Sequence, residues 1–259
     1  MESFKIKQIK ANAVNSLDDF VAEEIPFTLN ISDRELVTLL CTPGDLDNLV
    51  KGFLFTSGLI KKVVQIKKIV IDQQKWTAYV ELVDDIQMEE LVFKRLYTSG
   101  CGRGTLFYNA LDIMHRSKIK SELKIKNTLI SRLMADFQKK SETYLKTGGV
   151  HSAAMANSEK ILFFAEDIGR HNAIDKAIGT VLSENESFED KILITSGRIS
   201  SEVIFKMRKC QTPIVISKSA PTNQAVKLSR DMNITLVGFA RGNRMNIYSG
   251  FERIEFCED

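Results

Sequence analysis

The stretch that decides the fold reads ILITSGRISSEVIFKMRKCQTPIVIS and occupies residues 192–217. Two short apolar runs, Ile192–Thr195 and Ile214–Ser217, flank a segment with helical spacing over residues 200–209. Short, continuous apolar runs are typical of strands that are buried on both faces. Because helices that alternate with such strands cover a sheet, the stretch predicts a layered α/β fold.

The same alternation continues on both sides of this stretch. It predicts further helices and strands, in chain order a helix over 130–146, a strand over 162–165, a helix over 172–182, a helix over 222–231 and a strand over 235–239. No sequence repeat or low-complexity segment interrupts it. We therefore place an α/β domain at residues 128–259.

The first part of the chain follows a different pattern. Apolar and polar residues alternate over 27–40 and 67–83, which predicts two antiparallel hairpins. A helix is expected after Thr42-Pro43-Gly44-Asp45, with Thr42 as its N-cap and its end near Gly58. These elements predict a small α+β domain over residues 1–127, which ends with the loop around Cys101 and a basic linker, or a solvated helix face, over 116–126.

Composition narrows the functional classes. The net charge of +3 is too small to indicate a nucleic-acid partner. No apolar run approaches the ~20 residues of a membrane span, and the first residues lack a signal-peptide core. The four cysteines are scattered and form no CxxC pair, which favours reduced thiols. We therefore expect a cytoplasmic protein without a membrane segment.

One cysteine stands in an unusual setting. Cys101 lies among three glycines in the segment TSGCGRGT, residues 98–105, with Arg103 close by. Glycines let the backbone move, and a nearby cation favours the thiolate that attacks a persulfide. The alternative is a tight turn whose cysteine only packs. The other cysteines lack such surroundings and are predicted to be structural or incidental.

Polar residues follow three consecutive predicted strands. Small hydroxyl residues, glycines and cations at such positions can hold a phosphate-bearing ligand, on whose base Phe239 could stack. The alternative is a set of ordinary polar loops, and no Walker or GxGxxG motif is present. The predicted ligand-binding residues are Ser196, Gly197, Arg198, Ser217, Lys218, Phe239, Ala240, Arg241, Gly242, Asn243 and Arg244.

Carboxylates and imidazoles form a third group of candidates. Asp167 and His171, in the segment EDIGRHN, could act in acid–base catalysis. Alternatively, Asp167 caps the following helix and a neighbouring carboxylate fixes His171, a structural reading that the composition favours. His151 is a further candidate, but without a CxxC pair it has no zinc partners, so no metal site is predicted.

In this order, the motifs of the chain resemble the FdhD family of formate dehydrogenase accessory sulfurtransferases along nearly its whole length. The matching pieces are TPG at 42–44, GFL at 52–54, GLI at 58–60, GCG at 100–102, TGGVH at 147–151, EDIGRHN at 166–172, TSGR at 195–198, SE at 201–202, SKSAP at 217–221 and GFAR at 238–241.

The resemblance implies a small N-terminal domain, a cytidine-deaminase-like three-layer α/β domain and a homodimer. It implies that Cys101 accepts persulfide sulfur from a cysteine desulfurase. The sulfur then passes to the molybdenum of bis(molybdopterin guanine dinucleotide), bound against residues 239–244, and the loaded cofactor passes to the catalytic subunit of formate dehydrogenase.

The chain departs from the family pattern at Gly104, where many members carry a second cysteine. A local disulfide therefore cannot release the sulfur, which leaves direct transfer to the metal, transfer to an external thiol, or weakened transfer. His151-Ser152-Ala153 also lacks the glutamate of a deaminase. Two rival hypotheses remain: a cofactor-binding chaperone without sulfur chemistry, and a nucleotide hydrolase that uses Asp167 and His171.

Overall fold

The computed structural model describes residues 1–32, 34–83, 95–97, 105–107 and 118–256, so the predictions for Cys101, Gly104 and Cys257 lie outside it. No helix in these ranges is long and apolar enough to span a membrane. The elements are β1 (Glu2–Lys10), β2 (Ala13–Val21), β3 (Ile25–Ile31), β4 (Arg34–Cys41), α1 (Leu46–Thr56), η1 (Val63–Gln65), β5 (Ile66–Asp72), β6 (Thr77–Leu82), β7 (Arg95–Tyr97), β8 (Thr105–Phe107), β9 (Ile125–Lys126), α4 (Asn127–Lys140), α5 (Glu142–Thr147), β10 (His151–Ala156), β11 (Ile161–Asp167), α6 (Arg170–Ser183), β12 (Ile192–Thr195), α7 (Ser201–Cys210), β13 (Ile214–Ser217), α8 (Asn223–Asp231), β14 (Thr235–Arg241), β15 (Arg244–Ser249), η2 (Phe251–Arg253) and β16 (Ile254–Glu255).

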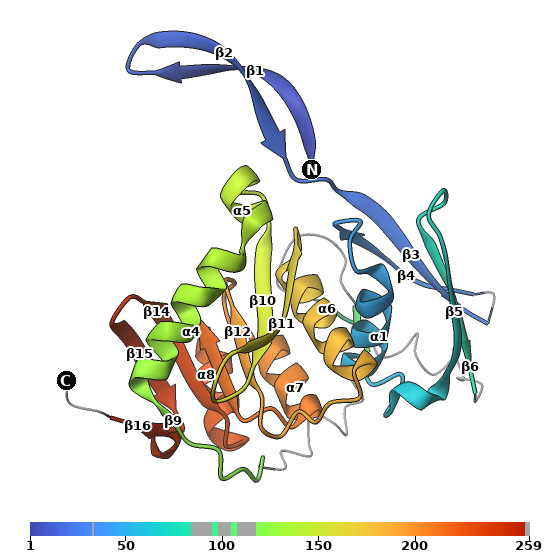
Figure 1. Ribbon diagram of the computed structural model, residues 1–259. Helices are drawn as coiled ribbons and strands as arrows, with labels where there is room; N and C mark the ends of the chain where they lie inside the picture. The colour runs from blue at the N-terminus through green and yellow to red at the C-terminus, as the bar shows by residue number, and fades with distance from the viewer. Residues whose placement is uncertain (33, 84–94, 98–104, 108–117, 257–259) are drawn as a thin grey trace.

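A six-stranded sheet in the order β11-β10-β12-β13-β14-β15 forms the centre of the molecule (Figure 1). Strands β12, β13 and β14 are parallel, and the other three are antiparallel to their neighbours. Ile192 and Ile194 of β12 pack toward α4, whereas Leu193 packs with the residues of α6, α7 and α8. The strand is apolar throughout because both of its faces are buried. The predicted three-layer α/β fold is confirmed.

The N-terminal part contains a four-stranded sheet in the order β4-β3-β6-β5, with α1 against its inner face. The two hairpins predicted here, β3–β4 and β5–β6, are confirmed. The prediction that Thr42 caps α1 is wrong, because the N-cap is Asp45, with φ of 54°. Thr42 instead donates its hydroxyl to the Asp167 carboxylate at 3.1 Å.

Three further details differ from the sequence predictions. The helix expected over 130–146 is divided into α4 and α5 at Ser141, whose hydroxyl donates to the Phe137 carbonyl. Strands β10 and β15 were not predicted. Residues 118–126 do not form the alternative solvated helix, since Ile119 is buried and its N–H donates to the Met232 carbonyl.

Helices α1 and α6 approach each other closely. A Cβ atom on Gly52 of α1 would lie 1.9 Å from the Asp175 carbonyl oxygen, and one on Gly179 of α6 would lie 1.9 Å from the Asn48 carbonyl oxygen. The two glycines therefore allow backbone-to-backbone contact. The main core extends across this contact and includes residues on both sides of position 127, while the proposed domain boundary stays a prediction.

This contact predicts the effect of one added methyl group. Gly52→Ala should force α1 and α6 apart and lower the free energy of unfolding by about 1–3 kcal/mol, the usual cost of overpacking. Gly44→Ala is the control, since nothing lies within 4 Å of the added Cβ. Urea denaturation of both variants measures the difference, and equal stabilities would contradict the close contact.

Candidate functional site

A cavity of about 450 Å³ opens beside the carboxyl end of β12. The loops after the parallel strands β12 and β13 and the end of β14 meet there with the start of β10, which runs antiparallel to β12. The residues that line the cavity are Phe137, Gln138, Ser141, Tyr144, Leu145, Gly148, Gly149, Val150, His151, Ser152, Ile168, Ser196, Lys218, Ser219 and Arg241. Its volume is in the range of small-molecule sites.

Three of the predicted ligand-binding residues, Ser196, Lys218 and Arg241, line this cavity. Two others shape the loops behind it. Ser217 is buried and donates its hydroxyl to the Gly197 carbonyl at 2.7 Å. A Cβ atom on Gly197 would lie 3.0 Å from Cβ of Arg170, so the loop after β12 needs a small residue where it meets α6.

The remaining predicted residues lie elsewhere. The expectation that residues 239–244 form a loop after a strand is wrong, because β14 continues to Arg241 and turns at Gly242 and Asn243 into β15. Ala240 is buried in the core. Arg198, Gly242, Asn243 and Arg244 are exposed and do not line the cavity.

Phe239 has an unusual backbone conformation. Its φ is 52°, in the left-handed region that costs a side-chain-bearing residue roughly 1–2 kcal/mol. The amide of Phe239 donates to the Ser219 carbonyl at 3.0 Å, which holds the strained residue beside the loop after β13. Phe239 does not line the cavity, and its stacking on a base stays a prediction.

Two cations define one side of the cavity. The Nε group of Arg241 donates to the Lys218 carbonyl at 3.0 Å, which fixes the guanidinium over the loop after β13. The Lys218 Nζ atom lies 5.9 Å from the centre of the Tyr144 ring. Phe137 and Ile168 add apolar surface. The cavity therefore combines positive charge with an apolar wall, a combination that suits an anion bearing an aromatic group.

His151 lies at the start of β10, where Nδ1 is 3.4 Å from Oγ of Ser196. Burial lowers the pKa of His151 below its ordinary value of 6.5, and the positive charge of Arg170 lowers it further. At neutral pH the imidazole is therefore uncharged. Ser196 also accepts a hydrogen bond from the Ser152 amide at 3.0 Å, so the ring faces an ordered hydroxyl.

Asp167 and His171 are both held by structural partners. The Asp167 carboxylate is fully buried, 2.7 Å from Nζ of Lys176, and it also accepts from the Gly169 amide. Asp167 does not cap α6, whose N-cap is Gly169, so that expectation is wrong. The expected carboxylate beside His171 is confirmed as Glu202, 2.7 Å from Nε2.

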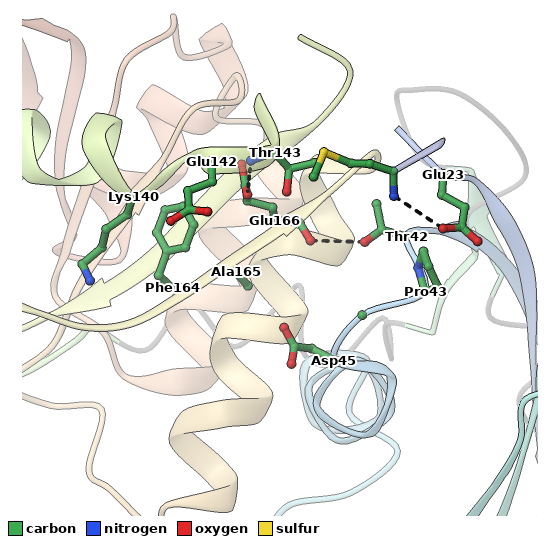
Figure 2. Close-up of a pocket in the computed structure, with 12 residues that line it drawn as sticks. Glu23, Thr42, Pro43, Asp45, Lys140, Glu142, Thr143, Phe164, Ala165 and Glu166 are labelled. Carbon is green, nitrogen blue, oxygen red and sulfur yellow. Dashed lines mark hydrogen bonds and ion pairs between the residues drawn. The ribbon is translucent and has the colours of Figure 1, made fainter. Parts of the chain in front are cut away.

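A second cavity, of about 420 Å³, lies beside β11 and the start of α1 (Figure 2). Its wall carries the carboxylates of Glu23, Asp45, Glu142 and Glu166. Glu166 accepts from the amides of Thr143 and Tyr144, which satisfies the first turn of α5. Within the described ranges, no group of three or more His, Cys, Asp or Glu side chains could hold a metal ion.

The sequence predictions missed several hydroxyl residues of the first cavity. Ser141 and Ser152 form a hydrogen bond of 3.0 Å between their side chains, and Ser219 lines the cavity next to Lys218. Ser152 directly follows His151, so the segment TGGVHS already carried this signal. Ser141 gave no sequence signal, because it lay within an expected continuous helix.

The histidines predict a dependence of stability on pH. The folded-state pKa values of His151 and His171 are lowered, for both mainly by burial, whereas the unfolded chain binds protons near pH 6.5. The unfolding free energy contributed by these neutral rings is present above about pH 6.5 and is lost as the pH falls below it. Urea denaturation between pH 7.5 and 5.5, values that bracket the ordinary pKa of about 6.5, should show a smaller loss for His151→Gln. An NMR titration midpoint of His151 at or above 6.5 would contradict this.

Three comparisons relate the chain to known proteins. The model of the FdhD/NarQ family matches residues 22–255. "Sulfur carrier protein FdhD" of Bacillus subtilis is 41% identical over 93% of the chain and 92% of the relative, and its namesake from Listeria monocytogenes serotype 4b is 40% identical over 96% and 97%. A crystal structure of a formate dehydrogenase accessory protein from Desulfotalea psychrophila shares the fold, with a TM-score of 0.79, 24% identity and coverage of 98% of this chain and 99% of the other. The match across nine-tenths of the chain shows that it belongs to the FdhD/NarQ family.

Proposed function

We propose that the protein is a cytoplasmic sulfur carrier that serves the maturation of formate dehydrogenase. The observation that carries the proposal is the similarity, at about 40% identity over nearly full length, to proteins named sulfur carrier protein FdhD. The sulfur donor is a cysteine desulfurase, and the recipient is the molybdenum of bis(molybdopterin guanine dinucleotide). The catalytic subunit of formate dehydrogenase then receives the cofactor.

The chemistry of the cysteines supports Cys101 as the carrier. Sulfur transfer needs a thiolate, which attacks the terminal sulfur of the donor persulfide while the donor cysteine leaves as a thiolate. Burial raises the pKa of the Cys41 thiol to about 12, and it also raises the pKa of Cys210. Both thiols stay protonated at neutral pH. Cys101, which is close in sequence to Arg103 and lies between glycines, matches the carrier position of the family.

The cationic cavity supports binding of the cofactor's guanine nucleotide. Lys218 and Arg241 provide charge for a diphosphate, and Phe137 and Ile168 provide apolar surface for a base. A volume of about 450 Å³ suits one guanine nucleotide of the cofactor. The rest of the cofactor, including its metal, would then extend out of the cavity, where the metal would be accessible to a persulfide.

The first test of this proposal is intact-protein mass spectrometry after incubation with a cysteine desulfurase and cysteine. The wild-type protein should gain the mass of one sulfur atom, and Cys101→Ala should not. Peptide mapping should leave Cys41 and Cys210 unmodified, because their thiols are buried and protonated.

The same experiment separates the carrier from its rival, a cofactor-binding chaperone without sulfur chemistry. If the wild-type protein gains no sulfur, or if Cys101→Ala restores formate dehydrogenase activity in cells that lack this protein, the chaperone is favoured. Turnover of a free guanine nucleotide would instead favour the hydrolase that uses Asp167 and His171.

The cavity predicts a second measurement, GDP binding by isothermal titration calorimetry. Lys218→Ala and Arg241→Ala should each weaken binding roughly ten- to hundredfold, because each removes a charge-assisted contact worth about 1.5–3 kcal/mol. Lys160→Ala is the control. It removes one exposed positive charge from the turn between β10 and β11, which lies near the amino end of β12 and so at the end of the sheet opposite the cavity. Equal affinities for all three variants would contradict the site.

A further inference from the structure

The cationic cavity extends across neighbouring strands of the central sheet. His151 begins β10, and Lys218 directly follows β13, with β12 between these two strands. Neighbouring strands lie about 4.8 Å apart, so β10 and β13 are about 10 Å apart. This separation suits the ribose and base of a nucleotide whose phosphates bind Lys218 and Arg241. The base of such a nucleotide reaches the side of the cavity that carries His151.

The hydroxyl of Ser196 determines which ring nitrogen of His151 carries the proton. Its oxygen accepts from the Ser152 amide at 3.0 Å, so the hydroxyl proton is left for a different partner. Among the described residues, the acceptor within reach of this proton is Nδ1 of His151, at 3.4 Å. Burial and the charge of Arg170 lower the pKa of His151, so the ring is neutral and can accept. A neutral ring that accepts at Nδ1 carries its proton on Nε2.

The Nε2–H group of His151 is open to a ligand. The side chain lines the cavity, and within the described ranges its hydrogen bonding is confined to Nδ1. None of the described residues that line the cavity is Asp or Glu, so no carboxylate is present there to accept from a base. Because an unmade hydrogen bond is costly, the cavity favours a base that presents an acceptor to this donor.

We propose that His151 is a specificity-determining residue, whose Nε2–H group donates a hydrogen bond to O6 of a guanine base in the cavity. Guanine and hypoxanthine carry an acceptor oxygen at position 6, whereas adenine carries an amino group there, which donates. Two donors that face each other both stay unpaired, so an adenine nucleotide is rejected. The inference rests on the proposed function, because it identifies what selects guanine in the nucleotide cavity.

Isothermal titration calorimetry with GDP, inosine diphosphate (IDP) and ADP tests this selection. The wild-type protein should bind GDP and IDP with similar affinity and ADP about tenfold or more weakly, because a hydrogen bond is replaced by two unpaired donors. His151→Ala should lose the preference for GDP over ADP. Lys218→Ala is the matched control. It removes a phosphate contact that all three nucleotides share, so it should weaken their binding alike and keep the preference.

The outcomes separate this inference from the proposed function. A preference for GDP that persists in His151→Ala, or an affinity for IDP as low as that for ADP, would overturn the inference and leave the nucleotide site in place. The comparison with IDP uses the wild-type protein alone, so it decides the question even if His151→Ala does not fold. A wild-type protein that binds neither GDP nor ADP would overturn the nucleotide site and the inference with it.

NMR of the histidine ring nitrogens tests the tautomer directly. At about pH 7.5, above the ordinary histidine pKa, His151 of the wild-type protein should carry its proton on Nε2, and GDP should shift this resonance. His171 is the internal control, since its Nε2 lies 2.7 Å from Glu202 and the residue does not line the cavity. A proton on Nδ1 of His151, or a His151 resonance that does not respond to GDP, would overturn the inference.

Discussion

The packing of α6 against its neighbours depends on two consecutive charged residues, Asp175 and Lys176, which are buried on this helix. Lys176 is ion-paired with Asp167 at the end of β11 and donates to Thr42, which precedes α1. Asp175 is ion-paired with Lys206 of α7 and accepts from the Thr56 hydroxyl at the end of α1. Consecutive residues of a helix point about 100° apart, so the two pairs tie α6 to different neighbours. Loss of one partner would leave a buried charge uncompensated, at a cost of about 3–5 kcal/mol.

These ion pairs also determine the position of one wall of the cationic cavity. Asp167 is anchored by Lys176, and the next residue, Ile168, lines the cavity. Two residues later, Arg170 begins α6 and packs against Gly197 in the loop after β12. The loop that carries Ser196 is therefore supported by a rigid helix, and the hydrogen bond from the Ser217 hydroxyl to the Gly197 carbonyl joins the loop that carries Lys218 to it. Such support preorganises a ligand site and reduces the entropy lost on binding.

The sequence predicted those elements whose apolar pattern is regular, continuous in β12 and β13 and alternating in the hairpins, and it missed elements without such a pattern. Strands β12 and β13 were found because both of their faces are buried. Strand β10 was missed because its small residues, HSAAMA, carry neither an alternating nor a strongly apolar pattern, although it is central to the sheet. Lys218 and Arg241 were expected near the ligand because parallel strands end at one edge. The role of Thr42 could not be predicted, because its partner Asp167 is 125 residues away.

The basic side chains fall into two groups that differ in their burial, and this difference bears on the proposed function. Lys176 and Lys206, which are fully buried, are paired with carboxylates and hold helices together. Lys218 and Arg241 lie at the cavity with partial or full exposure to water, where each contact with an anion is weakened by the high dielectric constant and by salt. A buried cation would hold a phosphate more tightly but would also slow its release, because affinity differences lie mainly in dissociation rates. Partly exposed cations on a rigid wall would therefore suit the proposed function, which requires that a nucleotide cofactor is bound and then released to another protein.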